Sequence, residues 1–310
     1  MSAPPLVPPI KCQGIKTKLV EEIRALAAMH DYERWVEPFC GSCVVPLNVQ
    51  PQRALLCDSN VHIIRLYQDI QAGRLTAPAV KAFLTEEGEK LRGQGEDHYY
   101  EVRERFNARP SSLDFLFLNR SCFNGVVRFN RSGKFNVPFC RKPDRFAVQY
   151  VSKITNQLRR IAEVIANKDW TFDVADFRAT LGRVRESDFV YADPPYAGRH
   201  VDYFNSWSEK DENDLAELLK GLPCKFILST WHSNEFRTNV LVEKNWTEPR
   251  FQLLTRQHFY HVGSTEDLRH AMTEALVTNL SGTRDAAAQP ELKQLALFEK
   301  PPRQFGNQAK

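Results

Sequence analysis

No apolar run in this chain of 310 residues approaches the length that crosses a membrane. The proline-rich start has neither a basic leader nor the apolar core of a signal peptide. The seven cysteines are odd in number and scattered, which fits reduced thiols better than a disulfide framework. These absences predict an intracellular, cytoplasmic protein that contacts no membrane.

Two common site patterns are also missing. The dinucleotide fingerprint G-x-G-x-x-G is absent, which weakens the case for NAD or FAD. Cys40 and Cys43 form a CxxC pair, but no second pair or nearby histidine lies at zinc-ligand spacing. We expect these two thiols to pack in the interior and expect no metal site. A net charge of +4 is too small to identify a partner by itself.

The most informative short stretch is Asp193-Pro194-Pro195-Tyr196, which follows the apolar run at residues 189–192. This pattern predicts a buried strand that delivers a stiff loop at its carboxyl end, where open α/β sheets bind ligands. Asp193 and the unpaired Pro194 carbonyl would accept hydrogen bonds from an amino group, and Tyr196 offers a face on which a base can stack. An ordinary surface loop is the alternative, because Pro-Pro is common in loops.

Two segments near the start indicate a Rossmann-like unit. Residues 35–39 read as a strand that enters the tight turn 40–43, and residues 54–58 read as a second strand ending in Asp58. In such units the terminal acid binds ribose hydroxyls. Asp58 can equally be an acid that stabilises the start of a helix through the helix dipole. Helices are expected at residues 16–30, 60–72, 146–165 and 208–220, and further strands at 226–229, 251–260 and 275–278.

A basic hairpin is predicted around residues 131–133, where a glycine lies in the turn between alternating apolar and polar residues. Seven basic residues against the single acid Asp144 lie in this region: Arg120, Arg128, Arg131, Lys134, Arg141, Lys142 and Arg145. Basic side chains interleaved with Asn and aromatics suit phosphate neutralisation and groove contact. A solvated hairpin without a ligand is the alternative.

The Asp-Pro-Pro-Tyr stretch resembles the catalytic motif of amino-methyltransferases that use S-adenosylmethionine, and most of residues 11–279 resembles the DNA adenine methylase (Dam) family of DNA adenine-N6 methyltransferases. The matching segments are residues 11–16, 37–43, 58–60, the Asn-Arg-x-x-x-Asn-Gly signature at 119–125, the Phe-Asn-Val-Pro-Phe signature at 135–139, and 193–196. The chain departs from the family pattern at Cys12, Ile15 and Cys43, where the family has Trp, Gly and Gly.

The resemblance implies an α/β fold, a Rossmann-like methyltransferase sheet with an inserted helical plus β-hairpin DNA-recognition domain. The catalytic domain would comprise residues 1–60 and 166–280, the target-recognition domain 61–165, and a flexible tail 281–310. The implied catalytic residues are Asp193, Pro194, Pro195 and Tyr196. The implied S-adenosylmethionine site consists of Cys12, Lys16, Glu37, Pro38, Phe39, Gly41, Asp58, Asp176, Phe177 and Asp193. The implied DNA contacts are Arg120, Asn124, Arg128, Asn130, Arg131, Lys134 and Arg141.

Within that set, the resemblance places Lys16 near the methionine carboxylate, Asp58 on the ribose, and Asp176 with Phe177 on the cofactor's adenine. A strand-end acid beside a core Phe explains the last pair equally well. The implied reaction is methyl transfer to N6 of an adenine flipped out of duplex DNA.

Two alternatives remain open at this point. An RNA adenine methyltransferase would carry the same socket, but a projecting ribbon suits the DNA major groove better than the deep, narrow groove of RNA. A DNA-binding module without catalysis is the second, motivated by Cys12, Ile15 and Cys43. Neither the recognition sequence nor the presence of a companion restriction enzyme follows from the residues.

The polar tail contains Gln294-Leu295-Ala296-Leu297-Phe298, which resembles the peptide by which bacterial proteins bind the replication sliding clamp. An apolar triplet on a tail without a core either binds another surface or folds back. The sequence therefore predicts a nucleoid-associated enzyme with the clamp as a possible partner, monomeric when free.

Overall fold

A computed structural model describes residues 4–196, 207–234, 236–259 and 271–280. The chain up to Leu280 forms one compact unit. Residues 281–310, with the predicted clamp peptide, lie outside the described residues. None of the described helices is both long enough and apolar enough to span a membrane.

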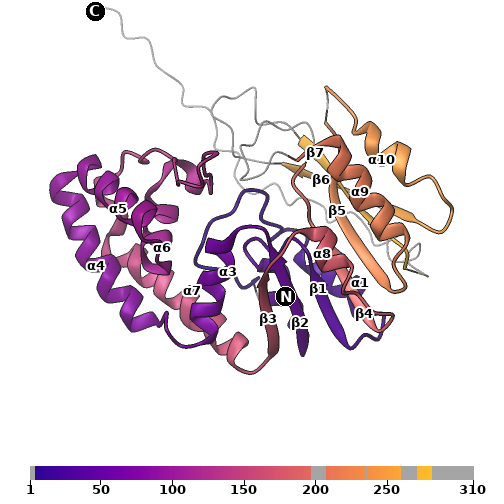
Figure 1. The fold of residues 1–310 in the computed structure, drawn as a ribbon, viewed down its shortest axis with the longest axis horizontal. Coiled ribbons are helices and arrows are strands. Elements are labelled where there is room, and N and C mark those ends of the chain that lie inside the picture. Colours follow the sequence, from indigo (N-terminus) through magenta and orange to yellow (C-terminus); the bar gives the residue numbers. More distant parts are fainter. Residues whose placement is uncertain (1–3, 197–206, 235, 260–270, 281–310) are drawn as a thin grey trace, which may run out of the picture. The chain divides into compact units, whose positions relative to one another are not determined.

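A seven-stranded sheet in the order β3-β2-β1-β4-β5-β7-β6 forms the centre of this unit (Figure 1). The strands are β1 Arg34–Glu37, β2 Arg53–Asp58, β3 Asp169–Val174, β4 Asp188–Ala192, β5 Lys225–Asn234, β6 Gln252–Phe259 and β7 Ala271–Thr278. The first five strands of that order pair in parallel, and β7 pairs antiparallel with both β5 and β6. This arrangement confirms the predicted Rossmann-like α/β fold.

The central strands are buried on both faces, as expected for a parallel sheet covered by helices. Every residue of β4 is buried, and the rings of Trp35 on β1 and Phe189 on β4 stack with centroids 5.2 Å apart. The connections from β1 and β4 leave in opposite directions along the sheet, because β2 lies on one side and β5 on the other. The carboxyl ends of these two strands therefore form the switch point at which α/β sheets bind ligands.

The helices begin at polar caps that the sequence contains. Asn60 accepts from the backbone of α3, and Ser208 forms a capping box with Asp211 at the start of α9. The helices are α1 Val20–Ala27, α2 Val44–Val49, α3 Val61–Gln71, α4 Ala77–Gln94, α5 Glu96–Ala108, α6 Ser112–Ser121, α7 Val148–Ala166, α8 Phe177–Leu181, α9 Glu209–Lys220 and α10 Val240–Asn245. The predicted first helix is shorter than expected, since residues 17–19 form turns and the helix ends at Ala27.

Helix α3 packs on the sheet, although it falls within the range predicted for the recognition domain. The side chain of Gln68 donates to the Phe172 carbonyl at 2.9 Å, and that of Gln71 donates to the Trp170 carbonyl at 2.7 Å. The ring of Tyr67 stacks on that of Phe172. The helices that gather beside this edge of the sheet are α4, α5 and α6 (Figure 1).

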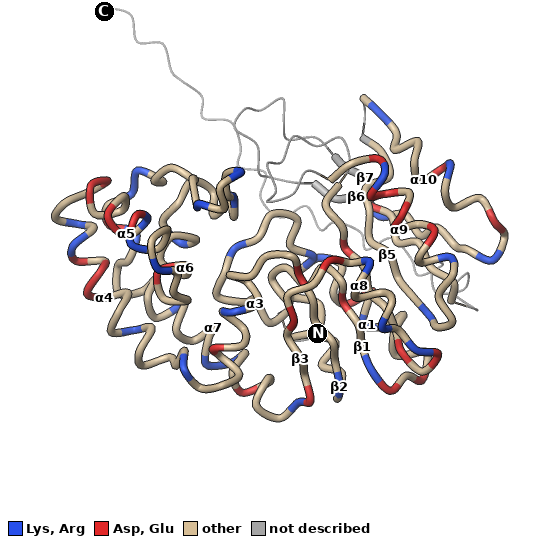
Figure 2. The backbone as a smooth tube through the Cα atoms, in the orientation of Figure 1, with Lys and Arg blue, Asp and Glu red and all other residues tan. Residues whose placement is uncertain are grey.

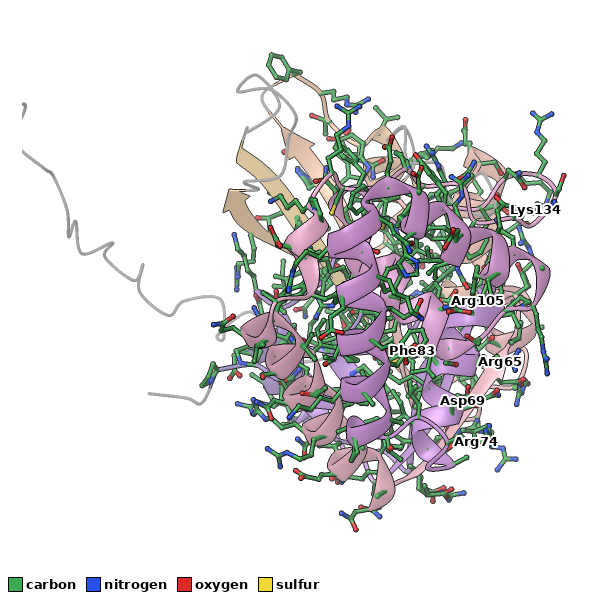
Figure 3. The ribbon with its side chains drawn as sticks, turned by 90° about the vertical axis from the view of Figure 1, so that its left-hand side faces the viewer. Arg65, Asp69, Arg74, Phe83, Arg105 and Lys134 are labelled. Carbon is green, nitrogen blue, oxygen red and sulfur yellow. The ribbon has the colours of Figure 1, made fainter. Side chains whose placement is uncertain are left out.

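Polar groups in the helical region tie those helices to one another. The Arg105 guanidinium pairs with the buried carboxylates of Glu87 and Asp114, and His98 lies against Glu87 at 3.1 Å. Arg105 lies between the helices, whereas Arg65, Asp69 and Arg74 lie further down and Lys134 at the upper edge (Figure 3). These ion pairs link α4, α5 and α6, and the hairpin segment follows α6 directly.

Helix α5 holds the hairpin directly. The Tyr99 hydroxyl donates to the Val137 carbonyl at 2.7 Å. Asn107 accepts from the Phe135 N–H at 2.8 Å and donates back to the Phe135 carbonyl at 3.2 Å. The ladder itself is short, with isolated bridges between Phe129 and Phe135 and between Cys122 and Phe139. The predicted hairpin is thus confirmed, and its orientation depends on α5.

Candidate active site

Three acids lie at the carboxyl ends of three adjacent strands. Glu37 ends β1, Asp58 ends β2, and Asp193 directly follows β4. These strands are neighbours in the order β2-β1-β4. Residues far apart in the sequence therefore face one edge of the sheet, as the sequence predicted from its strand-end acids.

The N-terminal segment brings a cation to this edge. Lys16 is 4% exposed, and its ammonium lies 2.8 Å from Asp193 Oδ1. The same nitrogen donates to the Gly14 carbonyl at 2.7 Å and lies 4.9 Å from the centre of the Tyr196 ring. Lys16 therefore holds both the acid and the aromatic residue of the Asp-Pro-Pro-Tyr stretch.

Burial controls the ionisation of this pair. The pKa of Asp193 is raised to about 6, because burial and the charge of Glu274 raise it more than the Lys16 ammonium lowers it. Burial alone would lower the pKa of Lys16, but Asp193, Tyr196, Tyr191 and Glu274 together outweigh it and raise this pKa well above its ordinary value. At neutral pH the site thus holds a carboxylate that is close to its titration range.

Asp58 organises the turn after β1. Its two carboxylate oxygens accept from the backbone N–H groups of Gly41 at 2.9 Å and Asn60 at 2.8 Å. Burial raises the pKa of Asp58, while these two N–H groups lower it. A Cβ added at Gly41 would meet no atom within 4 Å, so open space lies beside this turn. Each carboxylate oxygen keeps a second lone pair for a ligand hydroxyl.

The CxxC segment packs as expected. Cys40 and Cys43 are buried free thiols, and burial raises the pKa of each. Cys43 adopts a left-handed conformation with φ of 55° at the start of α2. This backbone geometry favours glycine, the residue found there in the family pattern, so the turn keeps the glycine-type geometry despite the substitution. Cys12 is partly buried and packs against the hydrophobic core, and burial raises the pKa of its thiol. A raised pKa keeps this thiol in its neutral form.

Glu37 is the most buried of the three acids at 2% exposure. It accepts from the Trp35 indole at 2.7 Å, and burial raises its pKa well above the ordinary value. The hydroxyl of nearby Tyr191 is buried without a hydrogen-bonding partner among the residues that the structure describes. Pro38 and Pro194 are buried, and Pro195 is half-buried. The edge therefore presents unsatisfied polar atoms that a ligand can pair with.

Three aromatic rings form a second wall. Phe39 and Phe177 stack with centroids 5.4 Å apart, and Trp207 lies 5.5 Å from Phe39 and 5.3 Å from Phe177. Asp176 caps α8, its carboxylate accepting from the Arg178 N–H at 2.9 Å, and is itself exposed. Trp207 was not among the residues predicted for the cofactor site, and the structure places its ring against Phe39 and Phe177, which were.

The predicted DNA contacts on the hairpin are mostly accessible. Asn130 accepts from the N–H groups of Ser132 and Lys134 and so builds the turn in which Gly133 has φ of 72°. Arg128 donates to the Asn136 side chain at 2.9 Å and is half-buried. The exposed members of the predicted set are Asn124, Asn130, Arg131, Lys134 and Arg141.

Arg120 is the exception among the predicted DNA contacts, because its side chain is buried. It is 5% exposed, donates to the Gln157 side chain at 2.7 Å, and lies over the Tyr150 ring. The reason is that α6 is buried almost all round, so every side chain of its last turn faces the interior. Its neighbour Asn119 binds the backbone of Lys11 through two hydrogen bonds and is likewise structural.

Comparison with known proteins identifies the class. The model of the D12 class N6 adenine-specific DNA methyltransferases matches residues 13–262. A DNA adenine methylase of Serratia marcescens is 32% identical over 81% of this chain and 86% of its own length. The Retron Ec67 DNA adenine methylase of Escherichia coli is 31% identical over 68% of this chain and 71% of its own.

Two further similarities are more distant. The modification methylase StsI of Streptococcus sanguinis is 28% identical over 87% of this chain and 42% of its own length. Among solved structures, the rRNA methyltransferase aviRa of Streptomyces viridochromogenes covers 90% of this chain and 88% of its own, with 12% identity and a TM-score of 0.36. That score is too low to bear on function.

The fold and the matches define a methyltransferase with S-adenosylmethionine as the methyl donor. The chain belongs to the D12 class of N6 adenine-specific DNA methyltransferases. It is an adenine-specific DNA methyltransferase, and its macromolecular partner is DNA. This membership decides against both earlier alternatives, the RNA enzyme and the binding module without catalysis.

Proposed function

We propose that the enzyme flips its target adenine out of the duplex and holds it at the Asp193–Tyr196 stretch. Asp193 and the Pro194 carbonyl accept from the N6 amino group, and Tyr196 stacks on the base. These acceptors orient the nitrogen lone pair toward the methyl group, so that positioning supplies most of the rate. The observation that carries this proposal is the pairing of half-buried Asp193 with buried Lys16, which fixes the carboxylate at the strand end.

The polar groups at the sheet edge fit S-adenosylmethionine, which carries an ammonium, a sulfonium, a ribose and an adenine. Glu37 and the Tyr191 hydroxyl, which has no hydrogen-bonding partner within the described part of the chain, supply polar atoms for the amino acid part, and Asp58 supplies acceptors for ribose. Exposed Asp176 is available to the cofactor's adenine amino group, beside the wall of Phe39, Phe177 and Trp207. When bound, the cofactor supplies an electrophilic methyl group.

We propose that the hairpin and the helices α4 to α6 form the recognition domain, with its start at α4 because α3 packs on the sheet. Lys and Arg residues are prominent in the upper part of this region (Figure 2). The exposed cations Arg131, Lys134 and Arg141 belong to this hairpin segment. Helix α5 holds the hairpin that carries these side chains, so that they can neutralise phosphates on either side of a groove.

The first prediction concerns salt dependence. We expect Arg131→Ala and Lys134→Ala each to weaken DNA binding and to lower the slope of log K on log salt by about one. Fluorescence anisotropy of a labelled duplex at several salt concentrations measures the slope. Arg53→Ala is the matched control, because Arg53 is an exposed arginine at the amino end of β2, away from the carboxyl ends of the strands. A slope unchanged in both hairpin variants would exclude the hairpin from the interface.

Cellular DNA identifies the modified base and its sequence together. We expect cells that express the enzyme to carry N6-methyladenine at one short sequence, read by single-molecule sequencing. The Asp193→Ala variant provides the matched background. Methylation at random adenines would contradict site-specific recognition by the hairpin. Because one relative is named a modification methylase, the same strain also allows a test of protection against restriction.

We further propose that Gln294, Leu295, Leu297 and Phe298 bind the replication sliding clamp. Apolar side chains in a polar tail are suited to a pocket on another protein, and the tether would raise the local enzyme concentration beside new DNA at the nucleoid. Titration of a purified clamp should show binding to the wild type and none to a Leu297→Ala, Phe298→Ala double variant. Equal binding by both would contradict the proposal. Sedimentation of the enzyme alone checks that it is monomeric.

A further inference from the structure

A buried carboxylate on β7 contacts the last residue of the Asp-Pro-Pro-Tyr stretch, which follows β4. Glu274 is 2% exposed, and its Oε1 accepts a hydrogen bond from the Tyr196 hydroxyl at 3.2 Å. These residues are 78 positions apart in the sequence. Burying a carboxylate costs free energy unless it is paired. A carboxylate inside a strand that is paired on both sides therefore indicates a specific role for its contact with Tyr196.

The strand geometry directs this side chain. Glu274 on β7 pairs in register with Trp231 on β5, directly beside an irregularity between Trp231 and Ser233. A bulge of this kind re-aims side chains near a site. On the other side Glu274 is in register with Arg256, but the Arg256 guanidinium pairs with Glu22 at 2.7 Å. The Arg256 guanidinium is thus engaged by Glu22, while the Glu274 carboxylate accepts from Tyr196 at the active-site edge.

Resting on the function proposed above, we propose that Glu274 is a positioning residue for methyl transfer. It fixes the Tyr196 ring from its hydroxyl end, while the Lys16 ammonium lies 4.9 Å from the ring centre. The ring is therefore held in its stacking orientation before the adenine arrives, which removes the entropic cost of ordering it during the reaction. Glu274 also adds a second negative charge beside Asp193, in a site whose methyl donor is a cation.

Two charged groups shift the pKa of Asp193: Lys16 from the segment before α1 and Glu274 from β7. Glu37 from β1 and Tyr191 from β4 also interact electrostatically with Asp193. Burial has the largest effect and raises the pKa of Asp193, Lys16 lowers this pKa, and the charge of Glu274 raises it. Removing the charge of Glu274 should therefore lower this pKa, which a role in packing alone would not do.

The test uses Glu274→Gln, which keeps an acceptor and the side-chain shape, and Tyr196→Phe, which keeps the ring and removes the hydroxyl. We expect each to lower kcat about tenfold, because Tyr196→Phe removes a hydrogen bond to a charged group and Glu274→Gln removes the charge that strengthens it, with little change in KM for DNA. The double variant should be no slower than the slower single variant, because both changes act on the same charged hydrogen bond. The thermal midpoints of all three establish that they fold.

The second readout is the pH profile of kcat/KM. Its acid limb, expected at about pH 6 from the pKa of Asp193, should move to lower pH in Glu274→Gln and stay in place in Tyr196→Phe. Additive losses in the double variant together with an unmoved limb would overturn this role. Asp193→Ala in the same assay separates the two proposals. If the wild type and Asp193→Ala transfer methyl groups equally, the proposed function fails. If Asp193→Ala loses transfer but the losses of the two single variants add, only the role of Glu274 is overturned.

Discussion

Asp193→Ala should abolish methyl transfer and leave DNA affinity nearly intact. The carboxylate is the acceptor proposed for the adenine amino group, and the variant also leaves the buried Lys16 ammonium without its partner at 2.8 Å. Loss of one preorganised polar group and of the geometry it maintains lowers the rate by at least about 10³-fold. The phosphate contacts proposed for the hairpin belong to another part of the chain. Single-turnover transfer and duplex anisotropy measure the two effects separately.

Two controls make this result specific. Asp193→Asn keeps one carbonyl oxygen in the same place, so we expect part of the rate to return. Asp169→Ala removes an exposed carboxylate at the start of β3, on the opposite edge of the sheet, and should leave both rate and affinity unchanged. A wild-type single-turnover rate in Asp193→Ala would reject the assignment of the adenine socket.

Lys16→Met should shift the pH dependence of the reaction to higher pH. Methionine keeps much of the side-chain length but removes the ammonium beside Asp193. Without this cation the pKa of Asp193 rises from about 6, because burial remains and its opposing charge is gone. A larger fraction of Asp193 is then protonated at neutral pH and cannot accept through that oxygen. We expect transfer at pH 7 to fall by at least about 10²-fold and to recover partly at pH 9.

The profile of log kcat/KM against pH measures this shift directly. Lys18→Met is the matched control, since Lys18 is an exposed lysine two residues further along the same segment. Its acid limb should stay where the wild type has it. An Lys16→Met profile that superimposes on the wild type would show that Lys16 does not control the ionisation of Asp193.

Local sequence signals predicted the elements that carry the site. The run before Asp193 became β4, Asp58 ended β2, and Asn60 and Ser208 capped helices, because each of these features depends on residues close in the chain. The turn after Asn130 formed for the same reason. Strand-end acids could be placed at one edge because parallel strands share their direction.

Contacts between distant segments were not predictable in this way. The pairing of Lys16 with Asp193 and of Tyr196 with Glu274 depends on the order of the strands, which the sequence pattern does not specify. The burial of Arg120 depends on α6 being enclosed almost all round, although Arg120 lies directly before the basic hairpin segment in the sequence. In Glu274 a usable signal was present, since an acid interrupts the apolar residues of β7.

The most direct test of the account is to identify the base that receives the methyl group. Purified enzyme is incubated with unmethylated DNA and S-adenosylmethionine labelled in its methyl group, and the digested nucleosides are separated by mass spectrometry. The account predicts label in N6-methyladenine alone, and none when Asp193 is replaced by alanine. Label in cytosine, or equal label with the alanine variant, would contradict it.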